Sequence, residues 1–316
     1  MKGLNQWWFG YGSPTALGVF RILMGALTFV NLAMVALYFD SWFTERGVVP
    51  PAIAQQYAAG AGRLNLLSSV TSTPLTMAFY AVVMLAALLT TIGLWTRVST
   101  IVLAVGVISL HHRNMLILHG GDTLMRVCLM YLAIAPAGAA CSLDRLIALW
   151  RGKAPVEPAP VPLLGQRLVQ FNVALLYLTT VWHKRGGTFW FDGTATWYPS
   201  NLHEFGRFWI PAGIEFSTWF VKLTTYGTLF AELALATLGF YRPFRKWVLL
   251  AGIAMHGFIE YRYNIPLFAF LTVSTYVCFY DGEEISAWAK RLGARFAPMK
   301  MILFTPRKAR LEQGPA

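Results

Sequence analysis

Charged residues are scarce in this chain of 316 residues, at 13%, whereas soluble domains carry about a quarter. Hydrophobic residues make up 56%, and the mean hydropathy is +0.52. This balance places the chain in the membrane class rather than the soluble class. The net charge of +12 lies mainly in short loops and a tail, and no RNA-binding or helix-turn-helix motif is visible. We therefore attribute the basic excess to membrane topology and predict no nucleic-acid partner.

Cysteine is also rare. Cys128, Cys141 and Cys278 are far apart, with no Cys-x-x-Cys pair and no zinc spacing. This pattern argues against a dithiol redox mechanism. Two histidines with Asp122 could bind a metal, but their spacing is not diagnostic. No metal is predicted.

Long apolar runs recur along the sequence. A spanning helix needs roughly 20 mostly apolar residues. Such runs lie at about 15–38, 76–95, 98–117, 123–139, 168–185, 217–240, 246–262 and 264–281. We predict an all-α integral membrane protein, a bundle of about eight transmembrane helices. The first run is too long for a signal-peptide core, so it is interpreted as a retained span.

Lysine and arginine predict the orientation of this bundle. They concentrate in alternate loops and in the C-terminal tail, which indicates that both termini are cytoplasmic. The expected location is a bacterial-type inner (plasma) membrane, with the lipid bilayer as the first partner. The proline-rich segment 151–163 should be extended. It predicts the following division: 1–150, a first four-helix half; 151–163, a linker; 164–282, a second four-helix half; and 283–316, a basic amphipathic cytoplasmic tail.

Several polar side chains interrupt the predicted spans, where each charge costs roughly 2.5–3.5 kcal/mol on insertion scales. With the orientation above, most of them fall in the outer half of the bundle. Asp122 and Arg126, four residues apart, could pair along one helix face. We therefore predict one polar cavity open toward the outer side, formed by His111, His112, Arg113, Asn114, Asp122, Arg126, Lys184, Arg185, Glu232 and His256.

The chemistry of this cavity would centre on Lys184. Burial disfavours the charged form of an amine, so a neutral Lys184 could act as a general base toward a lipid-soluble acid. His112 and His256 are the other candidate catalytic residues. Arg113 or Arg126 could hold a developing enolate or phenolate. Asn114, Asp122 and Glu232 are candidate binding residues.

Five segments carry a family resemblance. They are FRILMGALTFV at 20–30, ERGVVP at 45–50, HHRNMLILHGGDTLMR at 111–126, LYLTTVWHKRGGTFWFDGTATWY at 176–198 and LLAGIAMHGFI at 249–259. Together they resemble the HTTM family, the horizontally transferred transmembrane domain shared with vitamin K-dependent gamma-glutamyl carboxylases. The Arg-Asn…Gly-Gly-Asp block and the Lys…Trp-x-Asp-Gly-x-Ala block are the most specific parts. The resemblance adds Trp190 and Asp192 to the candidate binding residues.

The resemblance implies a reduced, vitamin K-like quinone as cofactor. In the carboxylases a lysine deprotonates this quinone, which is then oxygenated, and a peptide glutamate is carboxylated. The carboxylases carry two adjacent lysines where this chain has Lys184 and Arg185. Counting back from Trp190 leaves open which position matches the base, and an arginine would stay protonated.

Three functions are expected from these observations. The first is a carboxylase- or oxygenase-like enzyme that acts on a quinol-like lipid or a membrane-associated peptide. The second is a non-catalytic membrane partner in the maturation or export of a secreted peptide. It is favoured because the carboxylases have a large domain after the bundle, whereas this sequence ends about 35 residues after its last apolar run. A small-molecule transporter is third, since no inverted repeat is evident.

Overall fold

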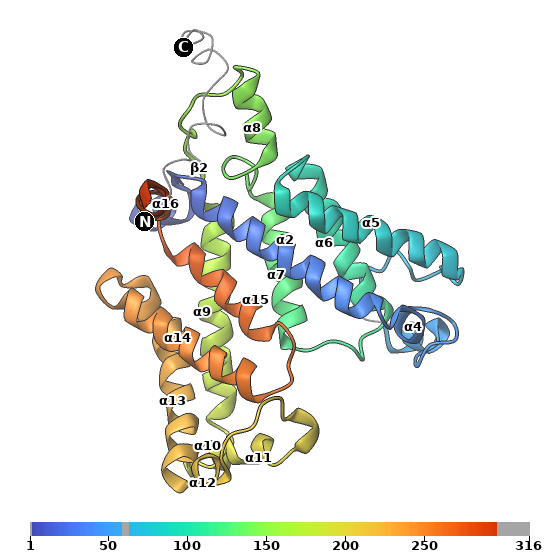
Figure 1. The fold of residues 1–316 in the computed structure, drawn as a ribbon, viewed down its shortest axis with the longest axis vertical. Helices are drawn as coiled ribbons and strands as arrows, with labels where there is room; N and C mark the ends of the chain where they lie inside the picture. The colour runs from blue at the N-terminus through green and yellow to red at the C-terminus, as the bar shows by residue number, and fades with distance from the viewer. Residues whose placement is uncertain (1, 59–62, 296–316) are drawn as a thin grey trace. The chain divides into compact units, whose positions relative to one another are not determined.

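The computed structural model describes residues 2–58 and 63–295 and is mostly helical (Figure 1). A helix overlaps each of the predicted apolar runs. These helices are α2 (Thr15–Ala36), α5 (Thr73–Ile92), α6 (Thr96–Arg113), α7 (Gly120–Ile134), α9 (Leu164–Lys184), α13 (Thr218–Thr237), α14 (Arg242–Arg262) and α15 (Phe268–Ser274). The all-α prediction is confirmed for the described residues.

Three of the described helices are long and apolar enough to cross a bilayer: α2, α5 and the helix at 218–240, which joins α13 to the 3₁₀ turn η2 (Leu238–Phe240). A shorter apolar helix covers 268–279, where α15 continues into η3 (Thr275–Phe279). The other predicted spans are shorter or more polar. The count of eight spans and the cytoplasmic termini stay predictions.

The chain divides into two compact units, described separately here. The first unit comprises residues 1–167 and 280–316, and the second comprises residues 168–279. The predicted partition at 150 and 164 concerns halves of a membrane bundle, which these units do not test.

In the first unit, α2, α5, α6 and α7 pack against one another, as the blue-to-green ribbons of Figure 1 show. Phe20, Leu103 and Met125 are buried in this core. Shorter elements complete the unit: α1 (Lys2–Phe9), α3 (Phe39–Phe43), α4 (Pro51–Ala58), α8 (Leu143–Trp150), α16 (Gly282–Arg295), and β1 (Tyr11–Gly12) paired antiparallel with β2 (Val161–Pro162).

The C-terminal helix α16 packs on α2. The hydroxyl groups of Ser286 and Thr15 lie 2.9 Å apart. Ile285 is buried, whereas Trp288 is 45% exposed. The predicted tail helix is therefore present as far as Arg295, and the rest of the predicted tail lies outside the described residues.

The junction between α5 and α6 depends on residues distant in sequence. Gly93 ends α5 with φ +70°, a conformation that favours glycine. Asp144, from α8, then accepts hydrogen bonds from the backbone N–H groups of Trp95 (2.8 Å) and Thr96 (2.7 Å) and from the Thr96 hydroxyl (2.7 Å). This carboxylate satisfies amides that the first turn of α6 leaves without helical partners.

Arg21 is fully buried within α2. Its guanidinium donates to the carbonyl oxygens of Ala137 (3.2 Å) and Cys141 (2.5 Å). These bonds attach the segment between α7 and α8 to α2, so the charge has a structural role.

In the second unit, α14 packs against both α13 and α15, and α9 contributes its residues from Leu168 onward. The segment at 186–216 contains α10 (Thr188–Phe191), α11 (Trp197–Ser200), η1 (His203–Phe205) and α12 (Ala212–Glu215). Arg262 anchors this loop, because its guanidinium pairs with Glu215 and donates to the Ser200 carbonyl at 2.9 Å.

Candidate functional site

An ion pair between Lys184 and Glu232 lies at the centre of the second unit's polar residues. Lys184 is the last residue of α9, and its Nζ lies 2.5 Å from Oε1 of Glu232 on α13. The Lys184 side chain is 19% exposed and that of Glu232 is 9% exposed. Lys184 is therefore paired with a carboxylate, whereas the general-base hypothesis assumed a neutral amine.

A second group of polar residues, Tyr177, His256 and Tyr276, forms a hydrogen-bonded chain. The Tyr177 hydroxyl lies 2.8 Å from Nε2 of His256 and 2.7 Å from the Tyr276 hydroxyl. All three residues are buried. A chain of polar groups in a low-dielectric interior fixes side-chain positions and can conduct a proton between its members.

The two groups are close to each other. Tyr177 and Lys184 are seven residues apart on α9, which places them on the same helix face. Electrostatic interactions link Lys184 to His256, and Glu232 to Tyr177 and Tyr276. We call these five residues, Lys184, Glu232, Tyr177, His256 and Tyr276, the Lys–Glu cluster.

Two buried atoms of this cluster lack a hydrogen-bond partner. Oε2 of Glu232 and Nδ1 of His256 have none among the residues that the structure describes. A buried polar group without a partner costs about 1–3 kcal/mol, so each such group in a native fold needs an explanation. A polar ligand that donates to the carboxylate would supply one.

Trp190, from α10, also contacts this cluster. The Lys184 ammonium lies 4.5 Å from the centroid of a Trp190 ring, within the range of a cation–π contact. Asp192, two residues further on, is exposed at the end of α10. The structure thus brings Trp190 to Lys184 and leaves Asp192 at the surface.

The candidate residues of the first unit gather at the C-terminal end of α6 but have a different environment. The Arg113 guanidinium donates to the carbonyl oxygens of Leu67 (3.1 Å) and Phe43 (3.2 Å). The Asn114 amide donates to the Trp42 carbonyl at 2.9 Å. Both side chains attach backbone segments to the end of α6.

Asp122 lies in the first turn of α7, where it caps the helix and does not pair with Arg126. Its carboxylate accepts from the backbone N–H of His119 at 2.8 Å, and Nδ1 of His119 accepts from the Gly121 N–H at 2.9 Å. This reciprocal arrangement is a capping box. The Arg126 guanidinium bonds instead to His112 Nε2 and to the Thr123 hydroxyl, each at 3.1 Å.

His112 has contacts at both ring nitrogens. Nδ1 lies 2.7 Å from the Leu64 carbonyl, and Nε2 faces the Arg126 guanidinium. The carbonyl requires a proton on Nδ1, and the guanidinium requires a lone pair on Nε2, so these contacts select the neutral Nδ1–H tautomer. His112 is thus held between a backbone acceptor and a cation.

The predicted residues therefore form two groups, one in each unit. Lys184, Glu232, His256 and Trp190 contribute to the second unit, while His112, Arg113, Asn114, Asp122 and Arg126 belong to the first. One shared cavity stays a prediction. Sequence reasoning missed Tyr177 and Tyr276, although the seven-residue spacing between Tyr177 and Lys184 was a signal for the first. Within the described ranges, no group of three or more His, Cys, Asp or Glu side chains is placed to hold a metal.

Apolar helices of membrane-spanning length and a buried ionisable cluster define a helical membrane protein. A sequence model of the HTTM domain matches residues 11–283, so the chain belongs to the HTTM family. The resemblance drawn from the sequence motifs is confirmed. Neither a curated protein nor a solved structure matches the chain.

Proposed function

We propose that this HTTM-family protein is a multi-pass membrane enzyme, related to the vitamin K-dependent carboxylases, that removes a proton from a lipophilic acid at the Lys–Glu cluster. The observation that carries the proposal is the Lys184–Glu232 ion pair, whose second carboxylate oxygen is buried without a partner. The substrate is a quinol-like lipid or a membrane-associated peptide. About eight spans in a bacterial-type inner membrane, with both termini cytoplasmic, belong to the same proposal.

The polar atoms of the cluster fit a reduced quinone. Such a group supplies a weakly acidic ring hydroxyl when bound. Glu232 Oε2 would accept a hydrogen bond from this hydroxyl, and His256 Nδ1 offers a second polar contact. Trp190 adds an aromatic surface beside Lys184. These residues suit a ligand that combines an aromatic ring with hydroxyl groups.

The ion pair determines how the proton moves. An ammonium bound to a carboxylate has no lone pair with which to accept a proton, so Lys184 in this pair is not itself the acceptor. Glu232 takes the proton at Oε2 and becomes neutral. Lys184 keeps its proton and neutralises the oxyanion that remains on the substrate. Total charge is conserved within the site, which suits a low-dielectric environment.

The Tyr177–His256–Tyr276 chain has a positioning role in this scheme. Tyr177 holds Nε2 of His256 at 2.8 Å and thereby orients Nδ1. Because Tyr177 and Lys184 share one face of α9, a change at the tyrosine would alter the geometry of the catalytic pair without removing either charge.

Copurified quinone and quinol consumption test the proposal. The full chain, purified in nanodiscs, would be extracted and its quinones measured by mass spectrometry. In air-saturated buffer, oxidation of added vitamin K hydroquinone by dissolved oxygen would be followed optically. We expect bound quinone in the wild type. Glu232→Gln and Lys184→Ala should each lower quinol consumption by a factor of about 10²–10⁴, the contribution of a positioned acid–base group.

Two further variants sharpen the assignment. Lys184→Arg keeps the positive charge and should retain part of the activity if Lys184 neutralises the anion, whereas it should abolish activity if Lys184 is the base. Lys222→Ala is the matched control, because Lys222 is an exposed residue of α13. Unchanged quinol consumption in folded Glu232→Gln and Lys184→Ala would contradict the enzyme and favour a non-catalytic partner of a secreted peptide.

A further inference from the structure

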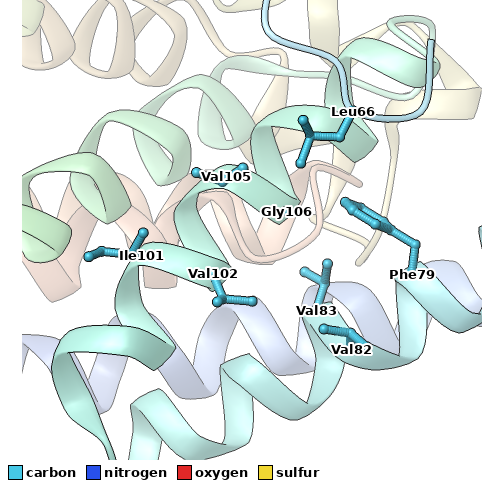
Figure 2. A pocket seen from close by; sticks show the side chains of 8 residues that line it. All are labelled: Leu66, Phe79, Val82, Val83, Ile101, Val102, Val105 and Gly106. Carbon is cyan, nitrogen blue, oxygen red and sulfur yellow. The ribbon is translucent and has the colours of Figure 1, made fainter. Parts of the chain in front are cut away.

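An apolar groove runs between α5 and α6 in the first unit (Figure 2). It has a volume of about 220 Å³. Phe79 and Val82 line it from α5, Ile101 and Val105 line it from α6, and Leu66 lies at one end. Leu66 and Val82 are each 54% exposed. Beside α5, which has membrane-spanning length and composition, such a groove would be open to lipid.

The Leu66 end of the groove leads to charged residues. The backbone N–H of Leu66 donates to the Ser109 hydroxyl at 3.2 Å, and the Leu64 carbonyl lies 2.7 Å from His112 Nδ1. Residues 64–66 therefore follow the last turns of α6. At His112 this path meets Arg126, whose guanidinium lies 3.1 Å from Nε2.

A second arginine lies at the same end. Arg63 is exposed and directly precedes Leu64, and its guanidinium contacts the sulfur of Met115, just beyond α6. The positive charges of Arg63 and Arg126 are close enough to repel each other. Asp122 attracts Arg126 from a distance, but in the part of the chain that the structure describes no carboxylate lies within ion-pair distance of either arginine.

We propose that the α5–α6 groove binds one acyl chain of an anionic phospholipid, and that Arg63 and Arg126 hold its phosphate. The charge pattern favours this occupant, since an apolar channel that ends at two cations complements an acyl chain that ends at an anionic head group. Basic pockets beside transmembrane helices bind lipid phosphates in this way, and guanidinium groups match phosphate oxygens. The site does not involve Lys184 and is independent of the proposed enzyme activity.

Native mass spectrometry of the full chain in detergent tests this site. Dioleoyl phosphatidylglycerol and dioleoyl phosphatidylcholine would be titrated separately, and apparent affinities compared. We expect the wild type to prefer phosphatidylglycerol. Arg63→Gln, a change at an exposed residue that should not disturb folding, should weaken phosphatidylglycerol binding roughly fivefold, as should Arg126→Gln. Phosphatidylcholine carries the same phosphate but is neutral overall, so both changes should weaken its binding less than they weaken phosphatidylglycerol binding.

Filling the groove with a large side chain should change the apparent lipid affinities in a different way. Val82→Trp should weaken binding of both phospholipids, because it occupies the acyl-chain position without removing a charge. Leu85→Trp is its control, since Leu85 is 55% exposed on α5 and outside the groove lining. Arg97→Gln, at the other end of α6, is the control for the arginines. Equal affinity of the wild type for the two lipids, or unchanged phosphatidylglycerol binding by Arg63→Gln, would overturn the proposal.

Discussion

The two polar clusters differ in how completely their side chains are satisfied. At the end of α6 in the first unit, Arg113 and Asn114 bond to backbone carbonyls, and His112 has partners at both nitrogens. Only Nδ1 of the adjacent His111 is buried there without a partner among the described residues. In the second unit, Glu232 and His256 each keep a buried atom without a partner. Polar groups whose bonds are complete stabilise a fold, whereas groups left incomplete at an energetic cost mark a site for a ligand.

This difference also separates residues that the sequence grouped together. All of them are polar residues in or beside apolar helices, and insertion cost alone gives them equal weight. Only their hydrogen-bond partners in the structure distinguish the residues of the two clusters. Mutations can test the distinction. Loss of a structural hydrogen bond should lower the free energy of unfolding, whereas loss of a ligand-binding group should lower quinol consumption.

The largest effect is expected at Arg113. Arg113→Ala removes two hydrogen bonds from a buried guanidinium to backbone carbonyls. The Phe43 carbonyl then has no partner among the described residues, while the Leu67 carbonyl keeps its bond from the Val70 N–H. The free energy of unfolding should fall by about 3 kcal/mol, measured by thermal unfolding in detergent. Quinol consumption per folded molecule should stay unchanged. A loss of activity with normal stability would remove the distinction between the clusters.

A control for this change lies on the same helix. Arg97 is exposed near the beginning of α6, so Arg97→Ala should alter stability by less than about 0.5 kcal/mol. A comparable loss in both variants would mean that any arginine on α6 matters, independent of its carbonyl partners.

An intermediate effect is expected at Tyr177. Tyr177→Phe keeps the ring but removes the hydroxyl between His256 and Tyr276. We expect about a tenfold fall in quinol consumption, below the 10²–10⁴-fold effect of the catalytic pair because both charges remain. Tyr226→Phe is the matched control, since the Tyr226 hydroxyl bonds to the Phe191 carbonyl instead. Equal activity of the two variants would exclude a positioning role for Tyr177.

The smallest effect is expected at Asp144. Asp144→Ala removes the capping carboxylate of α6 and should lower the free energy of unfolding by about 1–2 kcal/mol, again without a change in catalysis. Asp144→Asn should recover part of this loss, because its amide oxygen can still accept. Full stability of the alanine variant would show that water replaces the cap.

Hydrophobic runs predicted where the long helices lie, because burial and lipid exposure both require such runs. They could not predict the short helices α3, α4, α8 and α10–α12, which have four to eight residues and are too short to span a bilayer. The end of the third predicted span was wrong: α6 stops at Arg113, and Asn114 then turns the chain to reach the Trp42 carbonyl.

The sequence predicted three of the five residues of the Lys–Glu cluster. Lys184, Glu232 and His256 were found because charge or polarity within an apolar run is conspicuous. Tyr177 and Tyr276 were missed, since a tyrosine in an apolar helix resembles any other core aromatic residue. Arg113 and Asn114 were expected to bind a ligand, because no pattern in the sequence reveals which distant backbone carbonyls lie within reach of a side chain.

The carboxylate of Asp144 lies 48 residues after the Thr96 amide that it caps. During synthesis, the first turn of α6 is therefore made 48 residues before its own capping group. Until that group arrives, the first-turn amides of α6 must bond to water or to the insertion machinery. The start of α6 can therefore exchange these external hydrogen bonds for its native ones only after Asp144 of α8 has been synthesised.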